Sequence, residues 1–126
     1  HALQGDPSKG YLKGMSLEGI RNARARIEDA LGRMESAGMN RSDAEQILEE
    51  FHLNARMALF ALRLGEERLK AGCGTAQLPE SVCKPLADEL SQIIEKYSMV
   101  WLARNRAGGL SDSVGRLQSV MEVLSR

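Results

Sequence analysis

The stretch between Ser42 and Gly72 constrains the fold of this chain more than any other. It contains no proline, and Gly65 is its only interior glycine. Its apolar residues recur at steps of three and four, the spacing that places side chains on one face of an α-helix. Ser42 and Glu45 have the spacing of a capping box, which predicts the first turn of this helix. The predicted buried face comprises Ile47, Leu48, Phe51, Ala55, Ala58, Leu59, Leu62 and Leu69.

An earlier helix is predicted from about Ser16 to Ala37, with an apolar stripe of the same spacing. Ser16 is a suitable N-cap because its hydroxyl can accept from a free amide of the first turn. Gly38 can adopt the left-handed conformation that ends many helices. Residues 71–84 contain two glycines, a proline and both cysteines, which predicts a loop with room for one short turn.

Two further helices follow this loop. Pro85 fits the first turn of the third helix, where a missing amide hydrogen costs nothing. The pair Gly108-Gly109 predicts the end of that helix, and Ser111 is the expected cap of the fourth. Each helix has one apolar face, and four such helices can bury those faces against one another by forming a bundle.

The sequence therefore predicts an all-α fold, an antiparallel bundle of about four helices. The bundle is expected to span residues 16–126, because residues 1–15 scatter glycines and a proline among mostly polar residues and read as a leader or linker. Aromatic residues make up only 4% of the 126 residues, which also favours helix over sheet. This length supports one domain with a core of its own.

The composition argues against nucleic-acid binding and against a membrane-spanning helix. Lys plus Arg and Asp plus Glu number 17 each, so the basic excess typical of nucleic-acid binding is missing. No apolar run is long enough to predict a membrane-spanning helix. The expected location is cytoplasmic. There, Cys73 and Cys83 would be two reduced thiols, with a disulfide across the loop as the alternative.

The candidate chemical sites are sparse. Glu49 and His52 form a Glu-x-x-His step, but a di-iron bundle needs two such steps, so a surface pair is the expected interpretation. Arg21, Arg24 and Arg26 form a small basic cluster without interleaved aromatic residues, which indicates a solvated face. No catalytic residue, metal site or cofactor is predicted.

The most unusual group lies near the end of the third predicted helix and comprises Tyr97, Trp101, Arg104, Asn105 and Arg106. In one interpretation, the indole anchors the core while Asn105 shapes a tight turn between helices. In the other, this corner docks against another domain, because Arg and Trp are common interface anchors.

Around this corner the sequence resembles a known family. YSMVWLARNRAGGLSDSVGRL, residues 97–117, is similar to the C-terminal helical domain of bacterial family 20 glycoside hydrolases, the β-N-acetylhexosaminidases. NARMALFALRLGEERLKAG, residues 54–72, resembles the preceding long helix of that domain. Ala107 departs from the family pattern, which has proline at the corresponding position of the turn.

The resemblance implies a role without catalysis. The family's reaction takes place on a (β/α)8 barrel with an Asp–Glu pair, and this chain has neither, so no catalytic residue carries over. The expected function is a non-catalytic helical domain that packs against the catalytic barrel and contributes to a homodimer contact or to the rim of the sugar site. The expected interface residues are Tyr97, Trp101, Arg104, Asn105 and Arg106. The alternatives are a free-standing helical interaction module and a small metal-binding bundle enzyme.

Overall fold

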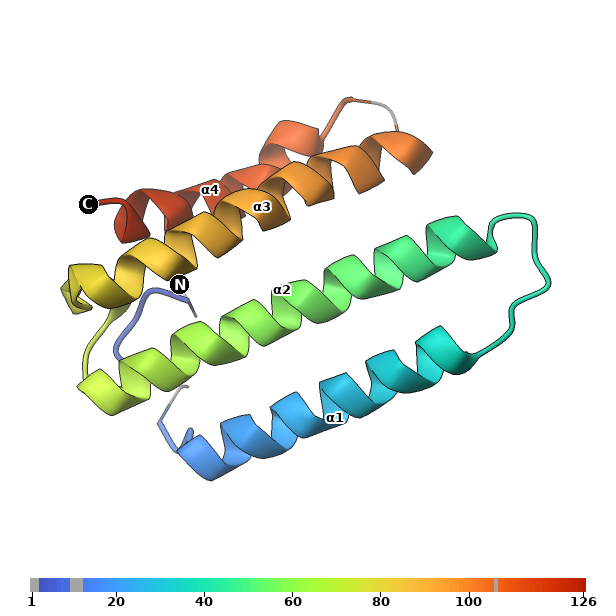
Figure 1. Ribbon diagram of the computed structural model, residues 1–126. Helices are drawn as coiled ribbons and strands as arrows, with labels where there is room; N and C mark the ends of the chain where they lie inside the picture. Colours follow the sequence, from blue (N-terminus) through green and yellow to red (C-terminus); the bar gives the residue numbers. More distant parts are fainter. Residues whose placement is uncertain (1–2, 10–12, 106) are drawn as a thin grey trace.

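The protein is an all-α fold, as the sequence predicts. The computed structural model describes residues 3–9, 13–105 and 107–126, and that part of the chain contains no strand. Its elements are α1 (Leu17–Ser36), α2 (Ala44–Ala71), the short 3-10 turn η2 (Thr75–Gln77), α3 (Glu80–Arg104) and α4 (Leu110–Leu124). Successive helices run antiparallel and pack on each other in chain order (Figure 1).

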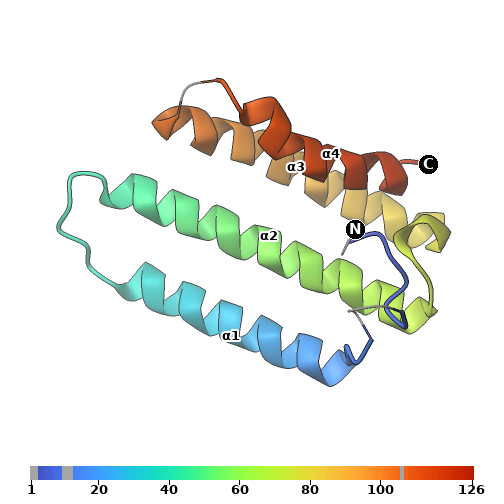
Figure 2. The ribbon, with the colours of Figure 1, turned by 180° about the vertical axis from the view of Figure 1, so that it is seen from behind.

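The arrangement places α2 in the middle. Helices α1, α2 and α3 lie side by side, and α4 covers the side of α3 that faces the viewer in Figure 2. The substantial contacts join α1 to α2, α2 to α3, and α3 to α4. As a result α1 forms an edge, and Ile20 is its only buried residue.

The position of α2 between two neighbours explains a difference from the predicted core. Most of the face predicted to be buried is only half-buried, and Ala55 alone of its eight residues is buried. The fully buried side of α2 carries Leu53, Phe60 and Leu64, which lie about half a turn away from that face. These residues pack in one cluster with Leu86, Leu90, Ile93, Val120 and Leu124 of α3 and α4.

Helix α2 is thus apolar on two opposite sides, one for each neighbour. On the α1 side, Gly65 is buried next to Ile20 and Met15, and a Cβ atom there would be in ordinary van der Waals contact, 3.7 Å from Ile20 Cδ1 and 3.4 Å from Met15 Cε. The apolar residues of α2 do recur with helical spacing, as predicted. The prediction assumed a single buried face, however, and so it missed the side that carries Leu53, Phe60 and Leu64.

The N-terminal caps differ in two of three cases from the prediction. Ser16 caps α1 as expected, since its Oγ accepts from the Gly19 amide at 3.0 Å. The predicted capping box of α2 is wrong, because the helix starts later, at Ala44, with Asp43 as N-cap. The Asp43 carboxylate makes no cap hydrogen bond and instead contacts Arg41 at 3.1 Å. An ion pair thus replaces the cap.

The predicted cap of α4 is also wrong. Helix α4 begins at Leu110, and its N-cap is Gly109 rather than Ser111. Gly109 has φ of 85°, a left-handed conformation that glycine adopts without steric cost. The amide of Ser113 donates to the Gly109 carbonyl at 3.1 Å and closes the first turn.

Two further boundaries differ. Ala37, in an extended conformation, ends α1, and Gly38 does not have the positive φ that was predicted. Helix α3 begins at Glu80 with Pro79 as N-cap, so Pro85 lies inside the helix rather than in its first turn. The Pro79 carbonyl accepts from the amides of Val82 and Cys83, which starts the helix one turn before Pro85.

Residues 3–9 form a strap that crosses the end of α2 next to η2 (Figure 1). Thr75 is fully buried, and its Oγ1 donates to the Leu3 carbonyl at 2.5 Å while its amide donates to the Gln4 carbonyl at 3.0 Å. Arg68, only 2% exposed, donates through Nη2 to the Gly5 carbonyl. This described part of the predicted leader is hydrogen-bonded to the helical domain.

Gly74 allows the strap to approach this closely. A Cβ atom on Gly74 would lie 2.9 Å from the Gln4 carbonyl oxygen, closer than such contacts normally come. Nearby, Cys73 and Cys83 are free thiols in the structure, and burial raises the pKa of the Cys83 thiol.

Candidate functional site

A groove of about 650 Å³ runs along α2 and is open to solvent. We call it the α2 groove. It is lined by Leu31 of α1, by Lys96 of α3, and by Glu45, Leu48, Glu49, His52, Leu53, Arg56 and Leu59 of α2. Its volume falls within the usual range of protein binding pockets.

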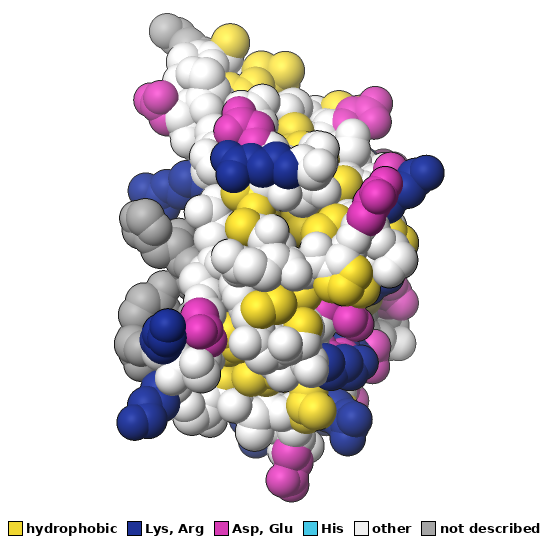
Figure 3. All heavy atoms as spheres, turned by 90° about the vertical axis from the view of Figure 1, so that its left-hand side faces the viewer, with side chains coloured by type: hydrophobic (Ala, Val, Ile, Leu, Met, Phe, Trp, Pro, Cys, Tyr) yellow, Lys and Arg dark blue, Asp and Glu magenta, His cyan; other side chains and the backbone are white. Residues whose placement is uncertain are grey.

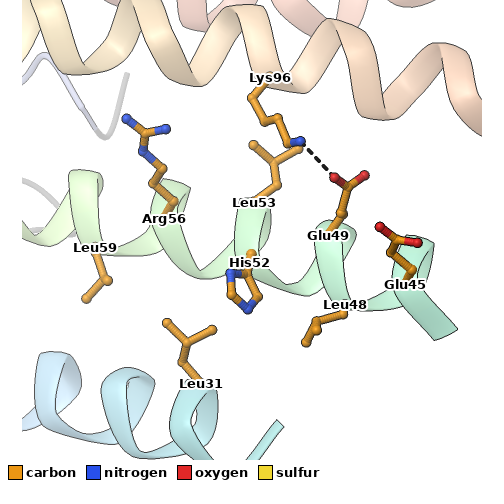
Figure 4. Close-up of a pocket in the computed structure, with 9 residues that line it drawn as sticks. All are labelled: Leu31, Glu45, Leu48, Glu49, His52, Leu53, Arg56, Leu59 and Lys96. Carbon is orange, nitrogen blue, oxygen red and sulfur yellow. Dashed lines mark hydrogen bonds and ion pairs between the residues drawn. The ribbon is translucent and has the colours of Figure 1, made fainter. Parts of the chain in front are cut away.

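The α2 residues of the groove share one face because they recur at steps of three and four. Figure 4 shows Leu48 and Leu59 directed toward Leu31 on α1, whereas Glu49 and Arg56 are directed toward α3. All three leucines are half-buried. The α1 side of the groove therefore carries these leucines beside His52, and the α3 side carries the charged side chains beside Leu53.

Polar contacts across the groove connect α2 to both neighbours. Glu49 Oε1 accepts from Lys96 Nζ at 3.0 Å, and His52 Nε2 lies 3.2 Å from Glu35 Oε1 of α1. Outside the groove, Arg63 continues the α2–α3 contacts with a 2.7 Å ion pair to Glu89. Pairs as exposed as these contribute at most about 1 kcal/mol each, so they position the groove walls more than they stabilise the fold.

Two groove charges are not neutralised within the described part of the chain. Arg56 Nη2 donates to Gln92 Oε1 at 2.7 Å, a neutral amide, and Arg56 has no ion pair there. Glu45 lies in the first turn of α2 and has neither a hydrogen bond nor an ion pair among the described residues. Among the described residues, the groove thus has an unpaired carboxylate, Glu45, at one end and a guanidinium without a carboxylate partner, Arg56, about three turns further along α2.

The predicted Glu49–His52 pair is not brought together as a unit. Glu49 pairs with α3 and His52 with α1, so the two side chains serve different helix contacts. Among the described residues, no cluster of three or more His, Cys, Asp or Glu side chains is placed to hold a metal ion.

The basic cluster on α1 is also divided. Arg24 reaches α2, where its Nη2 lies 2.6 Å from Glu66 Oε2. This hydrogen bond, together with one from Lys70, lowers the pKa of the Glu66 carboxyl. Arg21 and Arg26 are exposed. The cluster therefore fixes α1 to α2 through one arginine and is otherwise solvated.

The structure brings together the predicted corner residues that it describes. Tyr97 and Trp101 stack with ring centroids 6.1 Å apart and are half-buried. Asn105 ends α3, with its amide and its Nδ2 donating to the Trp101 carbonyl at 2.8 and 3.2 Å. Arg106 lies outside the described residues. These contacts are those of a structural corner.

Arg104 makes its ion pairs within the chain. Its Nε contacts Glu50 of α2, and its Nη2 lies 3.8 Å from Asp43. The guanidinium therefore joins the end of α3 to the start of α2. A hollow of about 190 Å³ lies beside this contact, lined in part by Glu50, Tyr97 and Trp101.

Sequence reasoning missed two exposed apolar residues near this corner. Met99 is 60% exposed and Leu102 is 52% exposed, the highest values among the large hydrophobic side chains that the structure describes. Both lie off the apolar stripe of α3, and an apolar residue on the solvent side of a helix was the signal that could have identified them. Met99 follows the groove residue Lys96 by about one turn of α3, and it is not itself among the residues that line the groove.

Charges elsewhere are mixed. On the end of the molecule shown in Figure 3, Lys and Arg side chains are interspersed with Asp and Glu, and apolar side chains lie between them. Within the part of the chain that the structure describes, no helix combines the length and the apolar character needed to cross a bilayer.

Comparisons with known proteins leave the α2 groove and the α3–α4 corner to be interpreted from their own geometry. No family model matches the chain, and no curated protein and no solved structure matches it significantly.

Proposed function

We propose that this chain is a non-catalytic helical domain that packs against a larger catalytic domain, as the C-terminal domain of a β-N-acetylhexosaminidase-like glycoside hydrolase would. The observation that carries the proposal is the presence of uncovered apolar side chains, namely the leucines that line the groove along α2 and the exposed Met99 and Leu102 on α3. Surfaces of this kind commonly mark contact sites for other proteins.

The resemblance of residues 97–117 and 54–72 supports the identity of the missing partner as a (β/α)8 barrel. The first of these segments forms the end of α3, the turn at Gly109 and the first half of α4. The second forms the later part of α2, from residue 54 to its end, and contributes Arg56 and Leu59 to the groove. A homodimer contact or a contribution to the sugar-site rim remains part of the proposal for the corner residues.

The test uses two proteins, the product of the complete gene and the isolated 126-residue chain. We expect the complete product to hydrolyse an aryl N-acetylglucosaminide and the isolated chain to hydrolyse none. Turnover by the isolated chain that survives repurification would contradict the proposal, as would a complete product without a barrel.

A double substitution tests the docking surface itself. Met99→Asp with Leu102→Asp should lower the melting temperature of the complete product, because it places charges in a buried contact. The same change should leave the isolated chain within about 0.5 kcal/mol of its parent, since both side chains are exposed there. Equal effects on both proteins would show that these residues face solvent in the complete product.

The alternative is a free-standing helical module that binds a partner helix, and the same groove favours it. The two proposals differ in the gene product: the alternative requires no barrel in the same polypeptide, and the mass of the native protein distinguishes them.

A further inference from the structure

The α2 groove has the dimensions and surface of a site for one helix. Its α2 residues extend from Glu45 to Leu59, roughly 21 Å along the helix axis. Leu31, Leu48 and Leu59 lie on its α1 side beside His52, and the charged side chains of Glu49, Arg56 and Lys96 lie on its α3 side beside Leu53. Grooves with this division typically receive the apolar face of an amphipathic helix, whose polar face stays at the rim.

The two uncompensated charges give the groove a direction. Glu45 and Arg56 lie about three turns apart on the same face of α2, roughly 16 Å along the axis. Neither charge is neutralised among the described residues. Glu45 has no polar contact there, and Arg56 donates a hydrogen bond to the uncharged side-chain amide of Gln92. A complementary ligand therefore carries a cation opposite Glu45 and an anion opposite Arg56.

A ligand helix that runs antiparallel to α2 can place these two charges where they also stabilise the ligand helix itself. Its amino end would lie near Arg56 and its carboxyl end near Glu45. Acidic residues are favourable near the amino end of a helix and basic residues near its carboxyl end, because of the helix dipole. The charge pattern of the groove and the preferred charge pattern of the ligand helix then coincide.

We propose that the α2 groove binds a single amphipathic helix, antiparallel to α2, with an acidic residue in its first turns, a basic residue about three turns later and leucine-like residues facing Leu31, Leu48 and Leu59. The inference rests on the proposed function in one respect: the helix is one on the outer surface of the catalytic domain. The groove then accommodates a helix that the isolated chain lacks.

The test uses two synthetic helical peptides of about 18 residues, long enough to form a helix with alanine at the remaining positions. Both carry leucines at helical spacing. The forward peptide has Glu near its amino end and Lys about three turns later, and the reversed peptide exchanges the two. Binding of each labelled peptide to the intact chain is followed by fluorescence anisotropy.

We expect the chain to bind the forward peptide about tenfold more tightly than the reversed one, since two attractive pairs replace two repulsive ones. The double variant Glu45→Lys/Arg56→Glu should invert this preference. A matched double variant outside the groove, Lys84→Glu/Glu95→Lys, should leave the preference of the parent chain unchanged. Leu59→Glu should weaken binding of both peptides about equally, because it acts on the apolar side.

Equal affinity for the two peptides, a preference that the double variant does not invert, or no binding would each overturn the inference. Sedimentation of the chain alone provides a further test, because a dimer that excludes the forward peptide would identify a second copy as the occupant and also overturn it. These failures leave the proposed function standing, since its hydrolysis assay on the complete gene product does not involve the peptides.

Discussion

The hydrogen bond from Thr75 to the strap provides a measurable test of whether residues 3–9 belong to the folded domain. Thr75→Val keeps the shape of the side chain and removes the hydroxyl that donates to the Leu3 carbonyl at 2.5 Å. Thr75 is 0% exposed, whereas Leu3 is half-buried, so water can partly replace the lost donor. We therefore take the low end of the cost of a lost buried partner, about 1 kcal/mol.

The expected consequences are global and local. Denaturation followed by circular dichroism should show a loss of about 1 kcal/mol and a melting temperature lower by about 4 °C. The amide of residue 75 donates to the Gln4 carbonyl of the strap at 3.0 Å. This amide exchanges with solvent when the strap opens. Because the substitution lowers the free energy of that opening by about 1 kcal/mol, the hydrogen-exchange protection of the amide should fall about fivefold.

The control is Thr75→Ser, which keeps the hydroxyl and removes a buried methyl group. It should also lose stability, because deletion of a buried methyl group costs about 1 kcal/mol, but the protection of the residue 75 amide relative to the rest of the domain should stay unchanged. If Thr75→Val left that protection intact, or if Thr75→Ser reduced it to the same extent, the strap would not depend on this hydrogen bond and the reasoning would be refuted.

Two further predictions concern the hydrophobic core and the loss of stability at low pH. Leu64→Ala should cost about 3 kcal/mol in urea denaturation, because Leu64 is fully buried, whereas Leu59→Ala on the groove should cost less than about 1.5 kcal/mol. Equal costs would contradict the assignment of Leu64 to the core and of Leu59 to the open groove. The hydrogen bonds from Arg24 and Lys70 lower the pKa of Glu66 in the folded protein, so this carboxylate contributes stability above the pKa of a free glutamate, about 4.3, and loses it as the pH falls through the lower folded value. In denaturation curves recorded as the pH is lowered from about 5, Glu66→Gln should therefore lose less stability than the parent chain. An unchanged slope would exclude this contribution.

How far the site could be predicted differs between its two regions. The sequence indicated the corner at the end of α3 because Trp101 is the only tryptophan and a glycine pair follows it. It did not indicate that the Arg104 guanidinium would be used within the chain, since its partner Glu50 comes from a distant part of the sequence. The α2 groove was not predicted, because its leucines have the spacing of core residues, and only the absence of a covering helix distinguishes the two situations.

Helix propensity and periodicity act within a few residues, so the local sequence was enough to predict that the chain forms four helices, although several of their ends were placed wrongly. Tertiary structure alone decided which faces meet. Helix α2 has two apolar sides because it lies between α1 and α3, and Arg68 is buried because a strap from the far end of the chain supplies the Gly5 carbonyl. The N-caps at Asp43 and Gly109 were also set by the tertiary structure. The residue that caps a helix depends on the path of the incoming chain and on distant partners, such as Arg104 for Asp43. Local sequence fixes the angle between side chains on one helix, but which angle faces a neighbour depends on residues that only folding brings together.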